Sequence, residues 1–217
     1  HSDLGDVLIQ PQMGKLRLHP GTADRPDEGY RSRFSHETEK ASAGYYEVLL
    51  RDDSIRAQLT ATQRVGIHRY TYPKGRESRF ILDLGHGIYN YDGKTLWASL
   101  RVENDTLLTG YRITNGWARC NYTYFAISLS KPLKSYGYRD RKEANYKGFW
   151  RKFDLQHNFP EMAGRDVVAY FNFDNVASRQ LTLKVALSAV STEGAIRNLQ
   201  HEAAGKSFEA LCEATKQ

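Results

Sequence analysis

The feature that most constrains the fold of this chain is an alternation of apolar and polar residues that begins near Tyr46 and recurs in segment after segment. In the stretch IRAQLTA at residues 55–61, every second side chain is apolar and those between are polar. Because successive side chains of a β-strand point to opposite faces, this pattern predicts strands with one face toward a core. We therefore expect a mainly β fold.

The expected strands are numerous and are separated by turn-forming dipeptides such as Asp92-Gly93 and Asn115-Gly116, which favour antiparallel connections. They outnumber the about seven strands of an immunoglobulin-like module. The sequence therefore predicts a large two-sheet antiparallel β-sandwich. Strands are expected near residues 55–61, 65–72, 79–84, 96–103, 106–114, 121–129, 149–154, 167–173 and 181–190.

Length and composition agree with one large β domain. The 217 residues include 40% hydrophobic residues, enough for an ordinary core, and the 14 tyrosines and 9 phenylalanines favour half-buried sheet over a helix bundle. The net charge of +6 is dispersed among acidic residues. The densest mixture of basic and aromatic residues, at 131–151, is interpreted as an edge hairpin, and no nucleic-acid partner is expected.

The sequence contains no recognisable metal, disulfide or membrane signal. Cys120 and Cys212 lie far apart and match neither a metal-binding spacing nor a disulfide framework, so both are expected to be free. The spacing typical of a calcium loop is absent as well, so no metal site is expected in this chain. No apolar run approaches the roughly 18 residues of a membrane span.

The pattern changes at Ser191, which can cap a helix whose apolar residues recur at helical spacing. Gly205 is expected to end that helix, and Ser207 to cap a second one. We therefore expect a β-sandwich domain at residues 1–190 and the start of a helical linker at residues 191–217.

Four long segments, in the same order, carry a resemblance to a known family. They are SDLGDVLIQPQMGKL at 2–16, DEGYRSRFSHETEKASAGYYEVLL at 27–50, LTATQRVGIHRYTYP at 59–73 and ILDLGHGI at 81–88. Together they resemble the N-terminal β-sandwich domain of glycoside hydrolase family 92, the calcium-dependent α-mannosidases. The resemblance implies a supersandwich of the galactose-mutarotase type that packs, through a helical linker, onto a separate (α/α) barrel domain.

The resemblance also implies a division of labour between the two domains. An acid, a base and a calcium ion that grips mannose hydroxyls would all belong to the barrel, which would hydrolyse mannosides with inversion. This chain is expected to stop before the barrel, to contain no catalytic residue and no calcium site, and to be inactive alone. Its implied partners are the catalytic helical domain and mannose-containing glycans, and its implied location is periplasmic, cell-surface or secreted, in a bacterium.

Family members carry a glycine-rich loop of the pattern SGTG-x-SD-x-GD that reaches into the sugar pocket. This chain begins at the last part of that pattern, SDLGD at residues 2–6, without the glycines that precede it. The resemblance therefore makes Ser2 and Asp3 candidate substrate-binding residues at the pocket edge.

The polar loop at residues 30–46 provides further candidates. His36, Glu37 and Glu39 are suited to contact sugar hydroxyls or to brace a domain interface. The alternative is a self-satisfied loop in which Arg31 and Arg33 pair with the two glutamates. Glu37 and Glu39 do not suit an acid–base pair, because flanking arginines would hold both ionised.

Arg64 and His68 are expected on one face of a strand with Tyr70, where they would line a polar groove or a domain contact; the alternative is a structural role inside the fold. His86 lies in LGHG at 84–87, where glycine permits close backbone approach. Exposed tryptophans could stack on sugar rings, although tryptophan in a large sandwich is commonly part of the core. The three candidates are Trp97, Trp117 and Trp150.

Two other functions fit parts of this sequence. The first is a free-standing, lectin-like sandwich that binds mannose-containing glycans through exposed aromatic residues and the loop at 30–46. The second is a sugar mutarotase-like enzyme, which would need a histidine and a carboxylate meeting in one groove. Sugar binding by the isolated chain favours the former, and epimerisation of a free sugar favours the latter.

Overall fold

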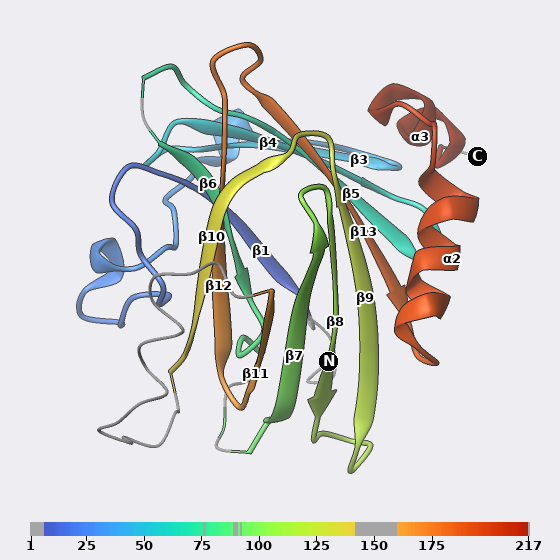
Figure 1. The fold of residues 1–217 in the computed structure, drawn as a ribbon. Coiled ribbons are helices and arrows are strands. Elements are labelled where there is room, and N and C mark those ends of the chain that lie inside the picture. Colours follow the sequence, from blue (N-terminus) through green and yellow to red (C-terminus); the bar gives the residue numbers. More distant parts are fainter. Residues whose placement is uncertain (1–6, 76, 89–90, 92, 142–159, 217) are drawn as a thin grey trace.

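The computed structural model describes residues 7–75, 77–88, 91, 93–141 and 160–216, which form a sandwich of two antiparallel β-sheets (Figure 1). Four strands form the smaller sheet and nine form the larger one. The only α-helices among these residues are two short ones at the C-terminal end, and they pack on the larger sheet. The predicted mainly β, two-sheet architecture is therefore confirmed.

The smaller sheet has the strand order β1-β6-β12-β10. Its strands are β1 (Leu8–Met13), β6 (Ser78–Asp83), β12 (Val167–Phe173) and β10 (Leu133–Asp140). The strand β1 lies at one edge and pairs with β6 so that Leu8 is opposite Asp83. The strand β1 therefore begins at the end of the sheet where β6 stops.

The larger sheet has the order β11-β7-β8-β9-β13-β5-β4-β3-β2, with the last strand of the chain at its centre. Its strands are β11 (Glu161–Gly164), β7 (Thr95–Asn104), β8 (Leu107–Thr114), β9 (Asn121–Leu129), β13 (Gln180–Ser188), β5 (Val65–Thr71), β4 (Ile55–Ala61), β3 (Tyr45–Leu50) and β2 (Lys40–Ser42). Two 3-10 helices precede β2, at Pro26–Glu28 and His36–Thr38.

The main core lies between the two sheets and is made by the alternating apolar residues that the sequence pattern predicts. Phe80 of β6 and Phe171 of β12 stack with ring centroids 4.9 Å apart, and the larger sheet contributes buried residues such as Leu100, Phe125 and Leu183. Burial of these side chains supplies the principal stabilisation of the sandwich.

A second core covers the outer face of the larger sheet. The helix α2 (Thr192–Ala203) is capped by Ser191, whose hydroxyl accepts a hydrogen bond from the backbone N–H of Gly194, and α3 (Phe208–Ala214) is capped by Ser207. Their apolar faces pack on the strands β5, β9 and β13. The residues in this contact are Val65, Ile67, Ala126 and Ala186 of the sheet and Ala195, Leu199, Ala203, Phe208 and Leu211 of the helices. The two predicted helices and their caps are confirmed.

Several elements differ from the predictions. The strands β1, β2, β10 and β11 were not predicted as such. The edge hairpin interpreted at 131–151 lies partly outside the described residues, and its described strand, β10, is an edge strand. The strand predicted at 149–154 lies outside the described residues.

Both cysteines are free. In the part of the chain that the structure describes, no helix is long and apolar enough to cross a membrane.

Candidate functional site

In the loop at 30–46, Glu39 and His36 pair with each other, whereas Arg33 pairs with a residue outside the loop. Glu39 accepts a hydrogen bond from the Tyr46 hydroxyl and pairs with His36, and these two contacts lower the pKa of Glu39. The predicted pairing of Arg33 with the loop glutamates is wrong, because Arg33 Nε binds Asp52 Oδ1 at 2.7 Å instead. The exposed His36 and Glu37 nevertheless remain accessible to a ligand or a domain.

Arg64 and His68 have partners inside the domain. Arg64 precedes β5, and its Nε donates to Glu202 Oε1 of α2 at 2.8 Å, while its backbone N–H donates to Oε2 of the same carboxylate. One ring nitrogen of His68 lies 2.8 Å from the Tyr70 hydroxyl, and Tyr70 belongs to the core between the sheets. Burial lowers the pKa of His68 to about 4, so its ring is neutral at physiological pH. The structure thus places Arg64 at the helix contact and His68 beside the inter-sheet core.

The remaining candidates divide between exposed and undescribed positions. Ser2, Asp3 and Trp150 lie outside the described residues. Trp97 is 40% exposed and Trp117 is 83% exposed, so the expectation that tryptophan belongs to the core is wrong for these two. None of the three pockets identified among the described residues is lined by the predicted substrate-binding residues His36, Glu37, Glu39, Arg64 and His68.

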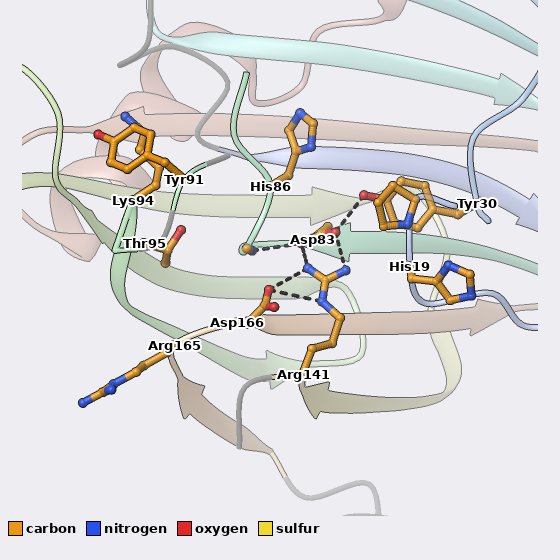
Figure 2. A pocket seen from close by; sticks show the side chains of 12 residues that line it. His19, Tyr30, Asp83, His86, Tyr91, Lys94, Thr95, Arg141, Arg165 and Asp166 are labelled. Carbon is orange, nitrogen blue, oxygen red and sulfur yellow. Dashed lines mark hydrogen bonds and ion pairs between the residues drawn. The ribbon is translucent and has the colours of Figure 1, made fainter. Parts of the chain in front are cut away.

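A polar pocket of about 340 Å³ lies instead at the end of β6, where β1 begins (Figure 2). Its walls come from the loop before β2, the turn after β6, the start of β7, the end of β10 and the turn between β11 and β12. The side chains that line it are His19, Pro20, Tyr30, Asp83, His86, Tyr91, Lys94, Thr95, Arg141, Arg165 and Asp166, together with the backbone of Gly85.

One buried ionic network forms the wall of this pocket. Figure 2 shows the Arg141 guanidinium between the Asp83 and Asp166 carboxylates, with the Tyr30 hydroxyl directed at Asp83. Arg141 Nη2 lies 2.7 Å from an oxygen of each aspartate, and Nη1 lies 3.0 Å from the second oxygen of Asp83. Asp83 is 1% exposed and also accepts a hydrogen bond from the Gly85 backbone N–H at 2.9 Å. Every oxygen of this buried carboxylate is therefore hydrogen-bonded.

The turn after β6 requires glycine at position 85. A Cβ atom there would lie 1.7 Å from Asp166 Oδ1 and 2.7 Å from an Arg141 nitrogen. The close backbone approach predicted for LGHG is therefore confirmed, and it places His86 at the pocket. Burial lowers the pKa of His86, so its ring is neutral and can both donate and accept hydrogen bonds.

The electrostatics of the wall favour recognition over acid–base chemistry. Burial alone would lower the pKa of Arg141, but Asp83 and Asp166 raise it overall, so the guanidinium stays charged. Burial and then the Asp83 charge raise the pKa of Tyr30, so its hydroxyl stays protonated. Both carboxylates are engaged by one cation, whereas general acid–base catalysis needs groups whose protonation states differ.

The described residues contain no group of three or more His, Cys, Asp or Glu side chains that could hold a metal ion. The two pocket carboxylates are bound to Arg141, so they do not fit a calcium site, which needs several oxygen ligands at about 2.3–2.6 Å.

Comparison with known proteins was made by sequence and by fold. The sequence profile of the Glycosyl hydrolase family 92 N-terminal domain matches residues 1–188. The family GH92 alpha-mannosidase BT3965 from Bacteroides thetaiotaomicron is similar at 36% identity and a TM-score of 0.84, over 98% of this chain and 28% of that chain. No curated protein matches the chain significantly.

Two further solved structures share the fold. The gh92 family glycosyl hydrolase ccman5 is 25% identical with a TM-score of 0.78, and the match covers 98% of this chain and 27% of that one. The Family GH92 Inverting Mannosidase BT2199 from Bacteroides thetaiotaomicron is 23% identical with a TM-score of 0.74, over 97% of this chain and 25% of that one. This chain therefore spans little more than a quarter of the length of the structures it matches.

Proposed function

This chain belongs to glycosyl hydrolase family 92, whose N-terminal domain it matches over most of its length, and on that premise we propose that it is the non-catalytic domain of a calcium-dependent, inverting α-mannosidase. The 36% identity to a Bacteroides thetaiotaomicron α-mannosidase, which has also been solved in complex with mannoimidazole, supports mannose-containing glycans as the substrate class. The domain scaffolds the catalytic helical barrel and contributes one wall of the substrate pocket.

The observation that carries the pocket role is the position of the polar cavity. It lies at the end of β6, and β1 starts beside it with Leu8 opposite Asp83. The segment that contains Ser2 and Asp3 leads directly into this strand. Neutral donors and acceptors such as His86, Tyr91 and Thr95 line the cavity and suit sugar hydroxyls.

The geometry of the aspartates supports placing the acid and the base elsewhere. Inverting hydrolysis needs two carboxyl groups about 6.5–9.5 Å apart, so that a water fits between the base and the sugar. In this chain, oxygens of Asp83 and Asp166 each lie 2.7 Å from the same Arg141 nitrogen, too close to each other for that arrangement. The chain's residues bind and orient the sugar, and the catalytic domain supplies the proton transfers and the calcium ligands.

The proposal includes a location outside the bacterial cytoplasm, either periplasmic, on the cell surface or secreted. The bacterial source of the similar α-mannosidase supports it.

The test compares this chain alone with the complete enzyme that contains it. We expect the complete enzyme to hydrolyse an aryl α-mannoside, to release β-mannose first by NMR, and to lose activity on calcium chelation. The chain alone should be inactive, and turnover by the 217 residues would overturn the proposal.

The pocket role is tested in the complete enzyme with His86→Ala, which should raise KM for an α-linked mannobiose about tenfold through loss of one or two hydrogen bonds. Val176→Ala is the matched control, because Val176 is exposed in the loop between β12 and β13 and lies outside the pocket. An unchanged KM in the His86 variant would remove this wall from the substrate site.

A further inference from the structure

The outer face of the larger sheet carries two cross-strand rows of large side chains, Trp97–Ile113–Tyr122 and Tyr111–Tyr124, which we call the aromatic strip. Residues directly opposite each other in an antiparallel pair share a face of the sheet. Trp97 of β7 is opposite Ile113 of β8, which is opposite Tyr122 of β9, and Tyr111 is opposite Tyr124. The five side chains therefore form one continuous surface.

The rings of the aromatic strip are ordered by one another and are open to solvent. Tyr122 and Tyr124 stack with centroids 6.1 Å apart and ring planes within 14°, and Tyr111 lies against Tyr124 at 5.8 Å. Trp97 is 40% exposed and Tyr122 is 43% exposed. Exposed aromatic patches on soluble proteins mark interaction sites.

A β-bulge turns Trp97 onto this face. The register of β7 against β8 shifts between Thr95 and Trp97, so one extra residue, Leu96, stands opposite the single step from Thr114 to Ile113. Thr95 faces the interior, where its hydroxyl accepts a hydrogen bond from the buried Arg112 and where it lines the polar pocket. Bulges commonly re-aim a side chain next to a functional site. The aromatic strip thus begins two residues from the pocket.

A second connection joins the pocket and the aromatic strip. Tyr91 lines the pocket, and its hydroxyl donates to the Asn115 carbonyl at 2.7 Å. Asn115 opens the turn between β8 and β9, which also carries the highly exposed Trp117. Figure 2 shows Tyr91 and Thr95 together at the pocket.

The surroundings of the aromatic strip decide which partner it fits. The helix α2 packs on the neighbouring row, Ala126 and Ala186, and the aromatic rows lie beyond that contact. Ser99 and Ser188 stand in register at the two ends of the Tyr111–Tyr124 row. A narrow row of amphipathic rings bounded by hydroxyl groups matches the apolar C–H face and hydroxyl rim of a sugar ring better than the broad aliphatic face of a helix.

The nearest charges on this face favour a neutral ligand. Arg101, two residues beyond Ser99 on the same side of β7, is paired with both Glu103 and Glu161. The positive charge of Arg101 is therefore balanced by carboxylates. A surface that binds phosphate or sulfate groups would instead present unbalanced positive charge.

We propose that the aromatic strip binds sugar rings of a neutral glycan by stacking, and that it holds the part of the chain that extends beyond the polar pocket. This inference rests on the proposed function, because it takes mannose-containing glycans as the ligand class. It assigns long or branched mannans, rather than mannobiose, as the ligands that engage the whole surface.

The test measures binding of soluble α-mannan and of mannobiose by calorimetry to the complete enzyme that contains this chain, kept inactive by calcium chelation. Trp97→Thr and Tyr122→Thr keep a β-forming residue in the sheet. Each should weaken mannan binding about tenfold, as expected from loss of one aromatic stacking contact of about 1.4 kcal/mol. Val176→Thr, at an 88% exposed position in the loop between β12 and β13, should leave it unchanged.

Circular dichroism melting establishes that each variant is folded before its affinity is compared. Binding that falls with rising salt, or that prefers heparin to mannan, would overturn the neutral-glycan assignment. Concentration-dependent dimerisation that Trp97→Thr abolishes would assign the surface to a second copy of the chain instead. Wild-type affinity in both strip variants, or no mannan binding at all, would refute the proposal.

This outcome is separable from that of the proposed function. If the aromatic strip does not bind glycans, the complete enzyme should still hydrolyse a small aryl mannoside. If the proposed function is wrong, that hydrolysis should be undetectable even in the wild-type enzyme.

Discussion

The buried network around Arg141 yields the sharpest prediction about stability. Arg141→Met keeps much of the side-chain volume but removes the cation that pairs with Asp83 and Asp166. The carboxylate of Asp83, at 1% exposure, would retain only its hydrogen bonds from Tyr30 and Gly85. Removal of one partner from a buried ion pair costs about 3–5 kcal/mol.

We expect the lower end of that range, about 3 kcal/mol, because the Arg141 side chain keeps 23% exposure and Asp166 keeps 16%. With a urea m-value of about 3 kcal/mol/M, at the upper end of the usual range, the unfolding midpoint should fall by about 1 M. Equilibrium unfolding in urea, followed by tryptophan fluorescence and by circular dichroism, measures this shift. Both probes should report one transition.

Two comparisons make the reasoning refutable. Arg33→Met removes an exposed arginine that pairs with Asp52, and it should change stability little, since exposed ion pairs contribute little. The double variant Asp83→Asn with Arg141→Met should lose clearly less than the sum of the two single losses, because each single change strands the other group. Strict additivity, or a loss below about 1 kcal/mol for Arg141→Met, would show that the network is not an energetic unit.

Three further predictions follow from single contacts. Glu202→Gln should cost about 1–2 kcal/mol of unfolding free energy, measured by thermal unfolding at neutral pH. Burial alone would raise the pKa of Glu202, but the hydrogen bonds from Thr62 and Arg64 lower it overall. The stability advantage of the wild type should therefore disappear as the pH falls through that lowered pKa. His68 should stay neutral in the folded protein until the pH approaches about 4, whereas it takes up a proton near pH 6.5 when the chain is unfolded. Wild-type stability should therefore fall between about pH 6.5 and 4, and His68→Gln should lose that dependence. An NMR titration midpoint above about 6 for His68 would contradict this. Gly85→Ala should lower stability by about 2 kcal/mol in urea unfolding, because its Cβ would overlap an Asp166 oxygen.

The strands that sequence analysis located are those whose two faces differ. In β4, Ile55 and Ala57 are buried and Arg56 between them is exposed, so alternation is visible in the sequence. The strand β1, LIQPQM, gives no such signal, because Pro11 and two glutamines interrupt the apolar residues. Proline is tolerated there because β1 is an edge strand, a property of the assembled sheet that a local pattern does not contain.

The candidate site was harder to predict because its residues meet only through the fold. Asp83 and Arg141 are 58 residues apart, and Arg141 and Asp166 are 25 apart, so no local motif joins them. The glycine at position 85 was the one sequence signal near the pocket, and the close approach there was predicted. Arg64 was misplaced because β5 begins one residue later, at Val65, so its side chain belongs to a turn beside α2.

The position of β13 in the larger sheet has a consequence for how the chain folds during synthesis. This strand is the last of the described strands to leave the ribosome, yet it joins β9 on one side to β5 on the other. Until it emerges, the strands β7 to β9 and the strands β2 to β5 form two separate ladders, each with an open edge whose backbone groups can pair with another chain. The nascent domain therefore passes through an aggregation-prone state that ends only when its C-terminal residues arrive, and a chaperone that shields strand edges should raise its yield.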